Sequence, residues 1–212
     1  MISFKQTAAC LGFAMILAIS CSQPAKHERA GQDSLTATTS IESGPADDSI
    51  PPSRSIIPGD RIGLTRLNDR ADSIVNNLGK PDSGDAAMGK SVSYWFSKPR
   101  KEVTMVYFTT NMGAPNAVPR AKQVSVTSSF FTTKSKVSTG ASLDFIKKKF
   151  PLLKILGEYS DKARKISVYN DPSGIAFNVD DSGRCIAITI YEAGKDPSQT
   201  YLSIHPGWKK QG

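Results

Sequence analysis

The pattern of apolar and polar positions predicts two short helices, each followed by a group of strands. Residues 69–78 carry apolar side chains at the i, i+3, i+4 and i+7 positions, and Pro81 prevents the helix from continuing. Residues 143–150 show a similar apolar stripe after Ser142, which is a typical N-cap residue, and Pro151 ends it. Both segments are therefore expected to be amphipathic helices that pack one face on a sheet.

Segments typical of β-strands follow each helix, and turn residues separate them. The expected strands are 91–96, 102–109 and 123–131 after the first helix, and 165–169, 174–179 and 184–191 after the second. Short extended pieces are expected at 61–67 and 201–204, and a polar, flexible loop at 82–90. Sequential strands joined by short turns form antiparallel meanders. The predicted fold class is therefore α+β, with short helices packed on antiparallel sheet.

The order of helix and then meander occurs twice, and Asp69 and Leu143, at the two helix starts, are 74 positions apart. This spacing suggests an internal duplication into two tandem modules, 58–132 and 133–207, with a tail at 208–212. Residue identity between the two halves is slight. A single irregular α+β domain is the alternative interpretation.

The first 20 residues have the layout of a signal peptide. Lys5 precedes an apolar run from 8 to 19, which is shorter than the roughly 20 residues that a helix needs to cross a bilayer. Ser20 then precedes Cys21, and the flank turns polar at once. This stretch resembles the lipobox of bacterial lipoproteins. The resemblance implies cleavage before Cys21, a diacylglycerol on its thiol, palmitate in the anchor, and a place in the cell envelope, with the outer membrane expected.

The lipobox usually has leucine three places before the cysteine, and here Ala18 stands there. An ordinary signal peptide cut near Ser20 and an uncleaved anchor are the alternatives. Residues 21–57 contain few aliphatic side chains and many Ser, Thr, Pro, Ala and Asp residues. Such a segment buries too little apolar surface to offset its ordering entropy, so it is expected to be a disordered tether. Its root-mean-square reach would be about 30 to 35 Å.

The charge of the chain is concentrated in its middle. Residues 97–165 hold fourteen basic and four acidic residues, a net charge of +10. This favours either an anionic partner or a solvated, solubilising face. Lys147, Lys148 and Lys149 could contact anionic lipid headgroups, although successive helical residues point about 100° apart. Trp95 is a candidate contact aromatic, because one face of its strand is either core or binding surface.

The sequence offers little catalytic chemistry. Residues 84–91 match the phosphate-binding pattern of glycine, four residues and Gly-Lys-Ser, but they follow a predicted helix and precede a predicted strand, the reverse of a P-loop. No nucleotide is therefore expected. No other cofactor and no metal is expected either, and nucleic acid would be an unusual partner for an exported, tethered chain. His205 is the only histidine after the tether and is expected in a turn, and Cys185 is expected to pack within a sheet.

The motif Leu78-Gly79-Lys80-Pro81 at a helix end, followed by the aromatic strand Tyr94-Trp95-Phe96, resembles a module of small bacterial envelope lipoproteins. It is similar to outer-membrane assembly lipoproteins of the SmpA/OmlA type and to the beta-lactamase-inhibitor-protein fold, which has two such modules in tandem. The resemblance covers about 58–206. It implies a protein that binds other proteins and performs no catalysis.

The sequence therefore predicts a non-enzymatic, lipid-anchored envelope lipoprotein. Its α+β domain is expected to bind an envelope protein through an exposed sheet face, with Cys21 as the lipid attachment site. The alternative function is binding of an anionic envelope glycan or lipid through the basic face. A hydrolase that uses His205 is a third, less favoured interpretation.

Overall fold

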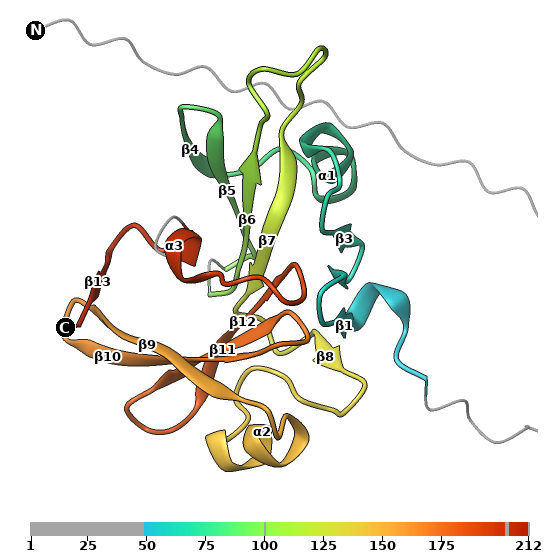
Figure 1. The fold of residues 1–212 in the computed structure, drawn as a ribbon. Helices are drawn as coiled ribbons and strands as arrows, with labels where there is room; N and C mark the ends of the chain where they lie inside the picture. Colours follow the sequence, from blue (N-terminus) through green and yellow to red (C-terminus); the bar gives the residue numbers. More distant parts are fainter. Residues whose placement is uncertain (1–48, 100, 202–203, 212) are drawn as a thin grey trace, which may run out of the picture. The chain divides into compact units, whose positions relative to one another are not determined.

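A nine-stranded antiparallel sheet runs through both halves of the folded chain, in the order β13-β9-β10-β11-β12-β7-β6-β5-β4 (Figure 1). The computed structural model describes residues 49–99, 101–201 and 204–211 of the chain. The strands of this sheet are β4 (Ser83–Ala87), β5 (Lys90–Phe96), β6 (Val103–Thr109), β7 (Arg120–Val126), β9 (Lys154–Asp161), β10 (Arg164–Asp171), β11 (Ile175–Asp180), β12 (Cys185–Tyr191) and β13 (Trp208–Lys210).

Each half of the sheet is a meander that follows one helix. Helix α1 (Ala71–Leu78) precedes β4 to β7, and helix α2 (Leu143–Lys149) precedes β9 to β12. The two meanders join where β7 pairs with β12, from Gln123↔Tyr191 to Val126↔Ile188. The predicted α+β class is therefore confirmed, and the two helix-and-meander groups share one sheet. That the halves arose by duplication stays a prediction.

A small second sheet packs beside the large one. Its strands are β1 (Ser55–Ile57), β2 (Arg61–Ile62), β3 (Thr65–Arg66) and β8 (Thr132–Thr133), in the order β3-β2-β1-β8. A 3-10 helix, η1 (Pro52–Arg54), leads into β1, and only 1% of Ile56 is exposed. Regular structure thus begins before the expected tether boundary at 57, because Ile56 pairs with Ile62 and packs into the core. The single strand expected at 61–67 is wrong, since Gly63 turns the chain between β2 and β3.

The two helices begin differently. In α2 the Ser142 hydroxyl accepts a hydrogen bond from the Phe145 N–H at 3.3 Å, which confirms the predicted cap. In α1 the N-cap is Arg70, and no side chain caps it. The sequence predicts Asn68 or Asp69 as the cap of this helix. The Asp69 carboxylate accepts instead from the Arg66 N–H at 3.0 Å, and neither side chain caps α1, so that prediction is wrong.

Three other segments differ from the sequence prediction. The expected loop at 82–90 contains β4, which pairs with β5 through a tight turn at Met88 and Gly89, both with positive φ. Strand β9 was not expected, and the extended piece expected at 201–204 begins with the end of a helix, α3 (Ser198–Tyr201). β4 lacks an apolar pattern because all five of its residues are exposed, and backbone pairing defines it.

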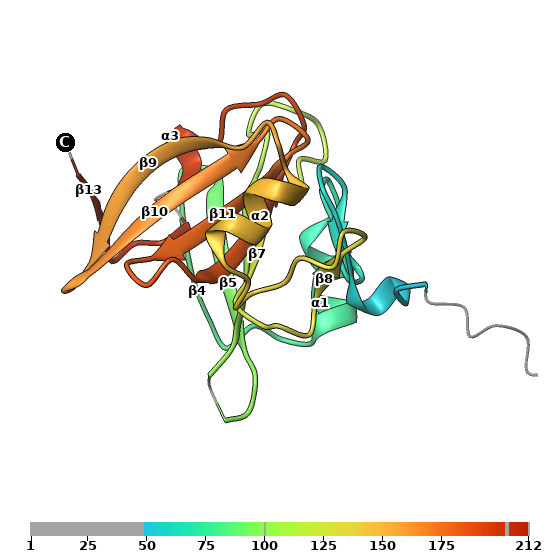
Figure 2. The same cartoon turned by 90° about the horizontal axis from the view of Figure 1, so that it is seen from below.

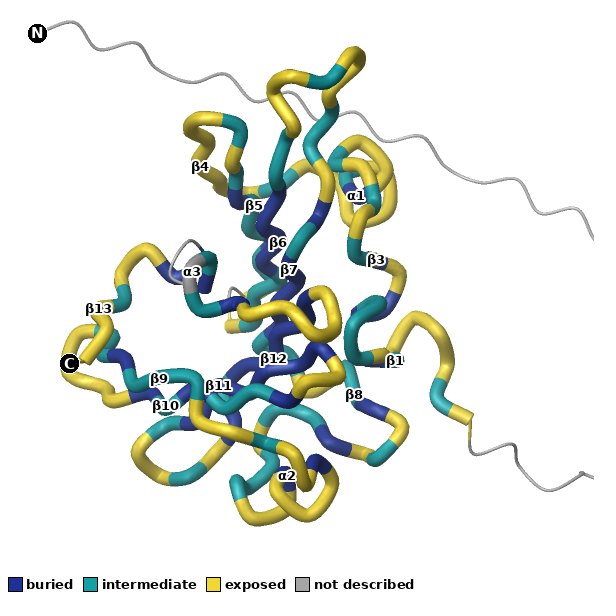
Figure 3. The backbone as a smooth tube through the Cα atoms, viewed as in Figure 1, coloured by how far each residue is buried: buried dark blue, intermediate teal, exposed yellow. Residues whose placement is uncertain are grey.

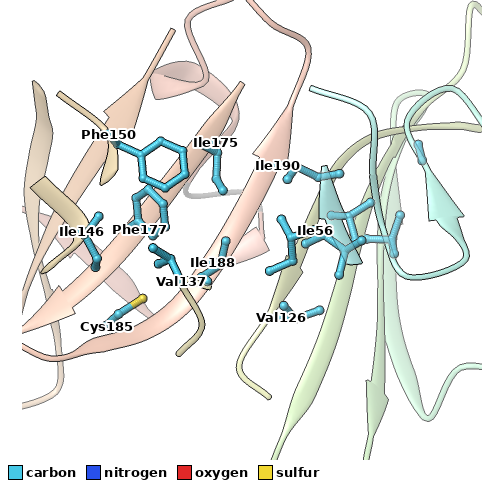
Figure 4. Packing of buried hydrophobic residues seen from close by; sticks show 14 of the residues in the cluster. Ile56, Val126, Val137, Ile146, Phe150, Ile175, Phe177, Cys185, Ile188 and Ile190 are labelled. Carbon is cyan, nitrogen blue, oxygen red and sulfur yellow. The ribbon is translucent and has the colours of Figure 1, made fainter. Parts of the chain in front are cut away.

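One face of the large sheet forms the main hydrophobic core. Helices α1 and α2 and the small sheet cover this face, while α3 lies on the other (Figures 1 and 2). The Phe150 and Phe177 rings lie 5.0 Å apart within it, with Ile146, Ile175 and Ile188 nearby (Figure 4). Buried backbone concentrates in the central strands, where both faces are covered (Figure 3). No helix in the described part of the chain is both long and apolar enough to cross a membrane.

Candidate functional site

The second face of the large sheet carries buried polar side chains beside a buried apolar cluster that includes Ile166, Val168 and Ala176. Gln123 and Ser125 of β7, Asn178 of β11 and Thr189 of β12 are all buried, with at most 2% of their surface exposed. Each alternates along its strand with apolar residues of the main core, such as Val124, so these polar side chains point to the opposite face. A buried polar group is costly unless it is hydrogen-bonded, so the arrangement requires partners.

The C-terminal strap lies over these polar residues. We use this name for the described residues of the segment that runs from α3 (Ser198–Tyr201) through Ile204 and His205 to β13 (Trp208–Lys210). Tyr201 and Ile204 are at most 1% exposed. The Tyr159 ring of β9 lies 6.1 Å from the Tyr201 ring and 5.8 Å from the Trp208 ring. Aromatic packing and a three-residue pairing of β13 with β9 therefore attach the strap to the sheet.

A hydrogen-bonded chain of side chains connects the strap to the sheet. The Tyr201 hydroxyl donates to the Oδ1 atom of Asn178. The Thr189 hydroxyl oxygen lies 3.2 Å from the Tyr201 hydroxyl and 2.9 Å from that of Ser125. Gln123 donates its amide N–H to the Thr200 hydroxyl. This network satisfies most of the polar groups beneath the strap.

His205 occupies a buried position in this network, with 7% of its surface exposed. Its ring stacks on the Trp208 indole at 3.9 Å and 7°, and its Nε2 atom lies 3.5 Å from the Asn178 Nδ2 atom. Because Asn178 Oδ1 already accepts from Tyr201, the amide N–H of Asn178 points to Nε2, and Nε2 acts as an acceptor. Burial lowers the pKa of His205 to about 4, against a smaller raising effect of the Asp161 carboxylate. His205 is therefore neutral at pH 7.

A cleft opens where the two meanders separate. β12 pairs with β7 only as far as Ile188, because the chain leaves the sheet after Val126. Residues 185–187 therefore border an opening with a volume of about 640 Å³. It is lined by apolar Met105, Ile166 and Ala187, by Asn178, His205 and Trp208, and by exposed Lys101 and Arg164.

The cleft offers several kinds of contact to a ligand. Arg164 is ion-paired with Asp161 at 2.9 Å, while Lys101 and Glu102 stand at the same margin. Among the residues that the structure describes, the Nδ1 atom of His205 has no hydrogen-bond partner, so its N–H can donate to an acceptor on a ligand. Apolar walls with a few hydrogen-bonding groups are typical of ligand sites in proteins.

The predicted site residues are not brought together. Cys21 lies outside the described residues. Lys147, Lys148 and Lys149 are exposed at the end of α2, and the first and last lie near aromatic rings of the protein itself, with Lys147 Nζ 5.9 Å from the Tyr169 ring. None of the three lysines lines the cleft.

Trp95 is a core residue. Its side chain belongs to the main hydrophobic cluster with 9% of its surface exposed, and its indole N–H donates to the Gly79 carbonyl at 2.8 Å. The interpretation of Trp95 as an exposed contact aromatic is therefore corrected. Its strand alternates, so Trp95 faces the helices while Val92 and Tyr94 face the strap side.

Two sequence interpretations of possible chemistry can be compared with the structure. Cys185 is 2% exposed at the start of β12, and burial raises the pKa of its thiol to about 12, as expected for a packing residue. Residues 84–91 form the β4–β5 hairpin, and no helix follows them, so they lack the geometry of a P-loop.

The geometry around His205 differs from that of a hydrolase. A turn places it, as expected, since its carbonyl accepts from the Trp208 N–H at 2.9 Å. Within the described ranges, no serine and aspartate both hydrogen-bond its ring, as a catalytic triad would need. Nor do the described residues bring three His, Cys, Asp or Glu side chains together in a way that could hold a metal ion.

Comparisons with known proteins do not assign the chain to a family. No protein-family model matches it, and no significant match to it was found among curated proteins or solved structures. The resemblance to small envelope lipoproteins therefore stays a prediction.

Sequence reasoning missed the strap and the residues beneath it. Asn178 stands between Phe177 and Val179 in an otherwise apolar strand, and a polar residue at that position was the one signal in the sequence. His205 and Tyr201 gave no such signal, because their burial comes from contacts with strands far away in the sequence.

Proposed function

We propose that this chain is a non-enzymatic, lipid-anchored lipoprotein of the cell envelope that binds another protein at the cleft on the strap side of the large sheet. The anchor would be a diacylglycerol on Cys21, and the outer membrane is the expected location. The cleft carries the proposal, because it joins apolar walls to a buried histidine, a buried amide and two exposed cations in about 640 Å³. That combination suits a protruding peptide segment of a partner.

The difference between the two faces of the sheet also supports this proposal. The helix side is closed by apolar packing, whereas the strap side carries hydrogen-bonding groups next to an open cleft. Polar groups with fixed partners supply orientation and specificity to a binding surface, and the apolar walls supply affinity. The sequence predicts binding through an exposed sheet face, and in this proposal the binding site is the cleft on the strap side of the large sheet.

The proposal is tested by placing a photo-crosslinking amino acid at Lys101, on the margin of the cleft, in intact cells. We expect one discrete crosslinked protein after irradiation. Ser129 is exposed and lines the cleft, so Ser129→Trp should fill its mouth and remove this product. Ser73→Trp, at an exposed serine of α1, is the matched control and should leave the product intact.

A crosslinker at Lys148 of α2 separates the main proposal from its alternative. If the basic face binds an anionic glycan or lipid, probes at Lys148 and not at Lys101 should give the ligand adducts, and salt should weaken them. Equal products at both positions, or a product at Lys101 that survives Ser129→Trp, would contradict binding at the cleft.

The lipid anchor is tested separately. Cells grown with labelled palmitate should incorporate the label into the chain, and Cys21→Ser should abolish incorporation. Cys185→Ser is the matched control, because Cys185 is buried and should not be acylated. Label that remains after Cys21→Ser would contradict the anchor.

A further inference from the structure

Some buried polar atoms of the sheet near the strap have no hydrogen-bond partner in the described part of the chain. Among the described residues, three buried side-chain polar atoms lack a hydrogen bond: Gln123 Oε1, the Tyr94 hydroxyl and Arg61 Nε. The first two contact the strap, since Gln123 bonds to Thr200 and Tyr94 packs in the cluster that contains Ile204. A buried polar group without a partner disfavours the closed state. Water would satisfy both atoms if the strap moved away.

The attachment of the strap is short. β13 contributes three paired residues and α3 one turn, so most of the attachment comes from the buried side chains of Tyr201, Ile204 and His205. The sheet face beneath it carries Ser125, Asn178 and Thr189, which can be hydrated when they are exposed. The same face also carries buried Ile166, Val168 and Ala176, so uncovering it exposes mixed polar and apolar surface, which costs less per unit area than a purely aliphatic core.

His205 makes the closed position sensitive to protonation. A proton on Nε2 would point at the Asn178 amide N–H, and Asn178 cannot turn without losing its bond from Tyr201. The cation would also be buried, with 7% of the histidine surface exposed, and attraction to the face of the stacked Trp208 ring would offset only part of that cost. A buried charge without a close counter-ion is strongly disfavoured.

The charged and titratable groups near His205 do not remove this penalty. Asp161 of β9 favours the cation, but it is paired with Arg164 of β10. Lys101 and Glu102, at the start of β6, line the same cleft with opposite charges. Tyr201 of α3 and Cys185 of β12 stay neutral, because burial raises the pKa of each.

We propose that the strap is a releasable cover of the sheet face beneath it and that protonation of His205 opens it, widening the cleft into a larger interaction surface. The proposal rests on the proposed function, because the surface that is uncovered adjoins the cleft where the partner would bind. In the closed state the strap therefore occupies the surface that a partner segment would bind after opening. We expect that segment to resemble the strap and to present aromatic and hydrogen-bonding side chains.

The direction and size of the effect follow from linkage. When the strap is closed, the pKa of His205 is about 4, and when it is open, the ring has an ordinary pKa of about 6.5. The open form therefore binds the proton more tightly, and acid favours opening as the pH falls from about 6.5 to 4. Between pH 7.5 and pH 5.0 the ratio of open to closed strap should rise about 30-fold.

The two tryptophans of the chain allow a direct test. Full-length protein with 5-fluorotryptophan in detergent micelles should give one fluorine NMR signal for Trp208 and one for Trp95. Trp208 lies in the strap and Trp95 in the main core, so Trp95 is the internal control. We expect the Trp208 signal to move toward the solvent-exposed position between pH 7.5 and 5.0, while the Trp95 signal stays in place.

Two variants determine whether His205 is the cause. His205→Gln cannot be protonated, so the Trp208 response should disappear in it. Lys209 and Ser160 are directly paired between β13 and β9, and a disulfide made by Lys209→Cys with Ser160→Cys should hold the strap closed at both pH values. An unchanged Trp208 signal in the wild-type chain would overturn the proposal. An equal response in His205→Gln would also overturn it.

The fluorine NMR signals of Trp208 and Trp95 are measured on protein without a bound partner, so they do not depend on the proposed function. A failed fluorine experiment with an intact Lys101 crosslink would reject the releasable strap and keep the cleft as the binding site. A pH-dependent Trp208 signal without a crosslink would instead reject the proposed partner site and keep the moving strap.

Discussion

The two faces of the large sheet are built from different chemistry. On the helix side, side chains such as Phe177 and Ile188 are fully buried among aliphatic and aromatic neighbours from both helices and both sheets. On the strap side, Asn178 and Thr189 of the sheet are buried in a hydrogen-bonded network with Tyr201 and His205 of a short C-terminal segment. Apolar packing has no preferred partner orientation, whereas each buried polar group requires a specific partner.

Because of this difference, we expect the helix side to contribute mainly to the stability of the fold and the strap side mainly to recognition of a partner. The helix side can tolerate small shifts in side-chain geometry without losing an obligatory interaction, and it contributes most of the buried apolar surface. The strap side depends on a few directional contacts, and two buried polar atoms there, Gln123 Oε1 and the Tyr94 hydroxyl, have no hydrogen bond to any residue that the structure describes. We therefore expect mutations on the helix side to affect the global fold and those on the strap side to affect the local cover.

The largest expected change in the free energy of unfolding comes from replacing one isoleucine on each side of the sheet. Ile188 on the helix side and Ile204 in the strap are both at most 1% exposed. Ile188→Ala should lower the free energy of unfolding by about 2 to 5 kcal/mol. Ile204→Ala should cost less, because the strap can detach before the sheet unfolds. Urea unfolding monitored by circular dichroism measures both, and equal losses would show that the strap is part of the global core.

The second largest expected effect is a dependence of the folding stability on pH. Because burial lowers the pKa of His205 to about 4, the unfolded chain takes up a proton more readily, and stability should fall as the pH drops from about 6.5 to 4. The loss should reach at most about 3 kcal/mol and should stop earlier if the strap opens.

Carboxylates with lowered pKa values do not obscure this effect. Hydrogen bonds from Ser182 and Ser198 lower the pKa of Asp180 and Asp196 below 3.8, and the stabilisation that they provide is lost only in more acidic solution. The difference between wild-type chain and His205→Gln in unfolding free energy therefore isolates the histidine. A difference that is independent of pH between 6.5 and 4 would contradict the assignment.

A smaller effect is expected from the network beneath the strap. Tyr201→Phe removes the hydroxyl that donates to Asn178 and leaves the Asn178 Oδ1 atom buried without that partner. The loss in stability should be about 1 to 3 kcal/mol. Tyr169→Phe, at a half-buried tyrosine on the helix side, is the control and should change stability by less than about 0.5 kcal/mol. Thermal unfolding of both variants measures the difference, and similar values would mean that the network contributes little.

The smallest effect is expected outside both faces. Replacing Lys147, Lys148 and Lys149 together by glutamine should change stability by less than about 1 kcal/mol, because the three side chains are exposed. The Lys101 crosslink should also survive the triple replacement. Loss of that crosslink would indicate that the basic end of α2 belongs to the binding surface.

Local sequence patterns predicted much of the fold but little of the candidate site. Some patterns depend only on residues that are close in sequence and can therefore be recognised without the structure. Examples are the apolar stripe in 143–150 with its Ser142 cap and the alternation in strands such as β5. β4 and β9 were missed, because all five residues of β4 are exposed and the bulge between β9 and β10 breaks the alternation. Trp95 was ambiguous, since its strand pattern fits either face.

The sequence by itself determined the fold class, helices α1 and α2, most central strands and the packing role of Cys185, because each depends on a short stretch of chain. The anchor at Cys21 stays a prediction. Only the tertiary structure decided that β7 and β12 join the meanders and separate below Ile188, which opens the cleft. It also decided that a histidine in a turn is buried against Trp208 and Asn178. The physical reason is that burial and pKa depend on residues that are distant in sequence and meet only when the sheet closes.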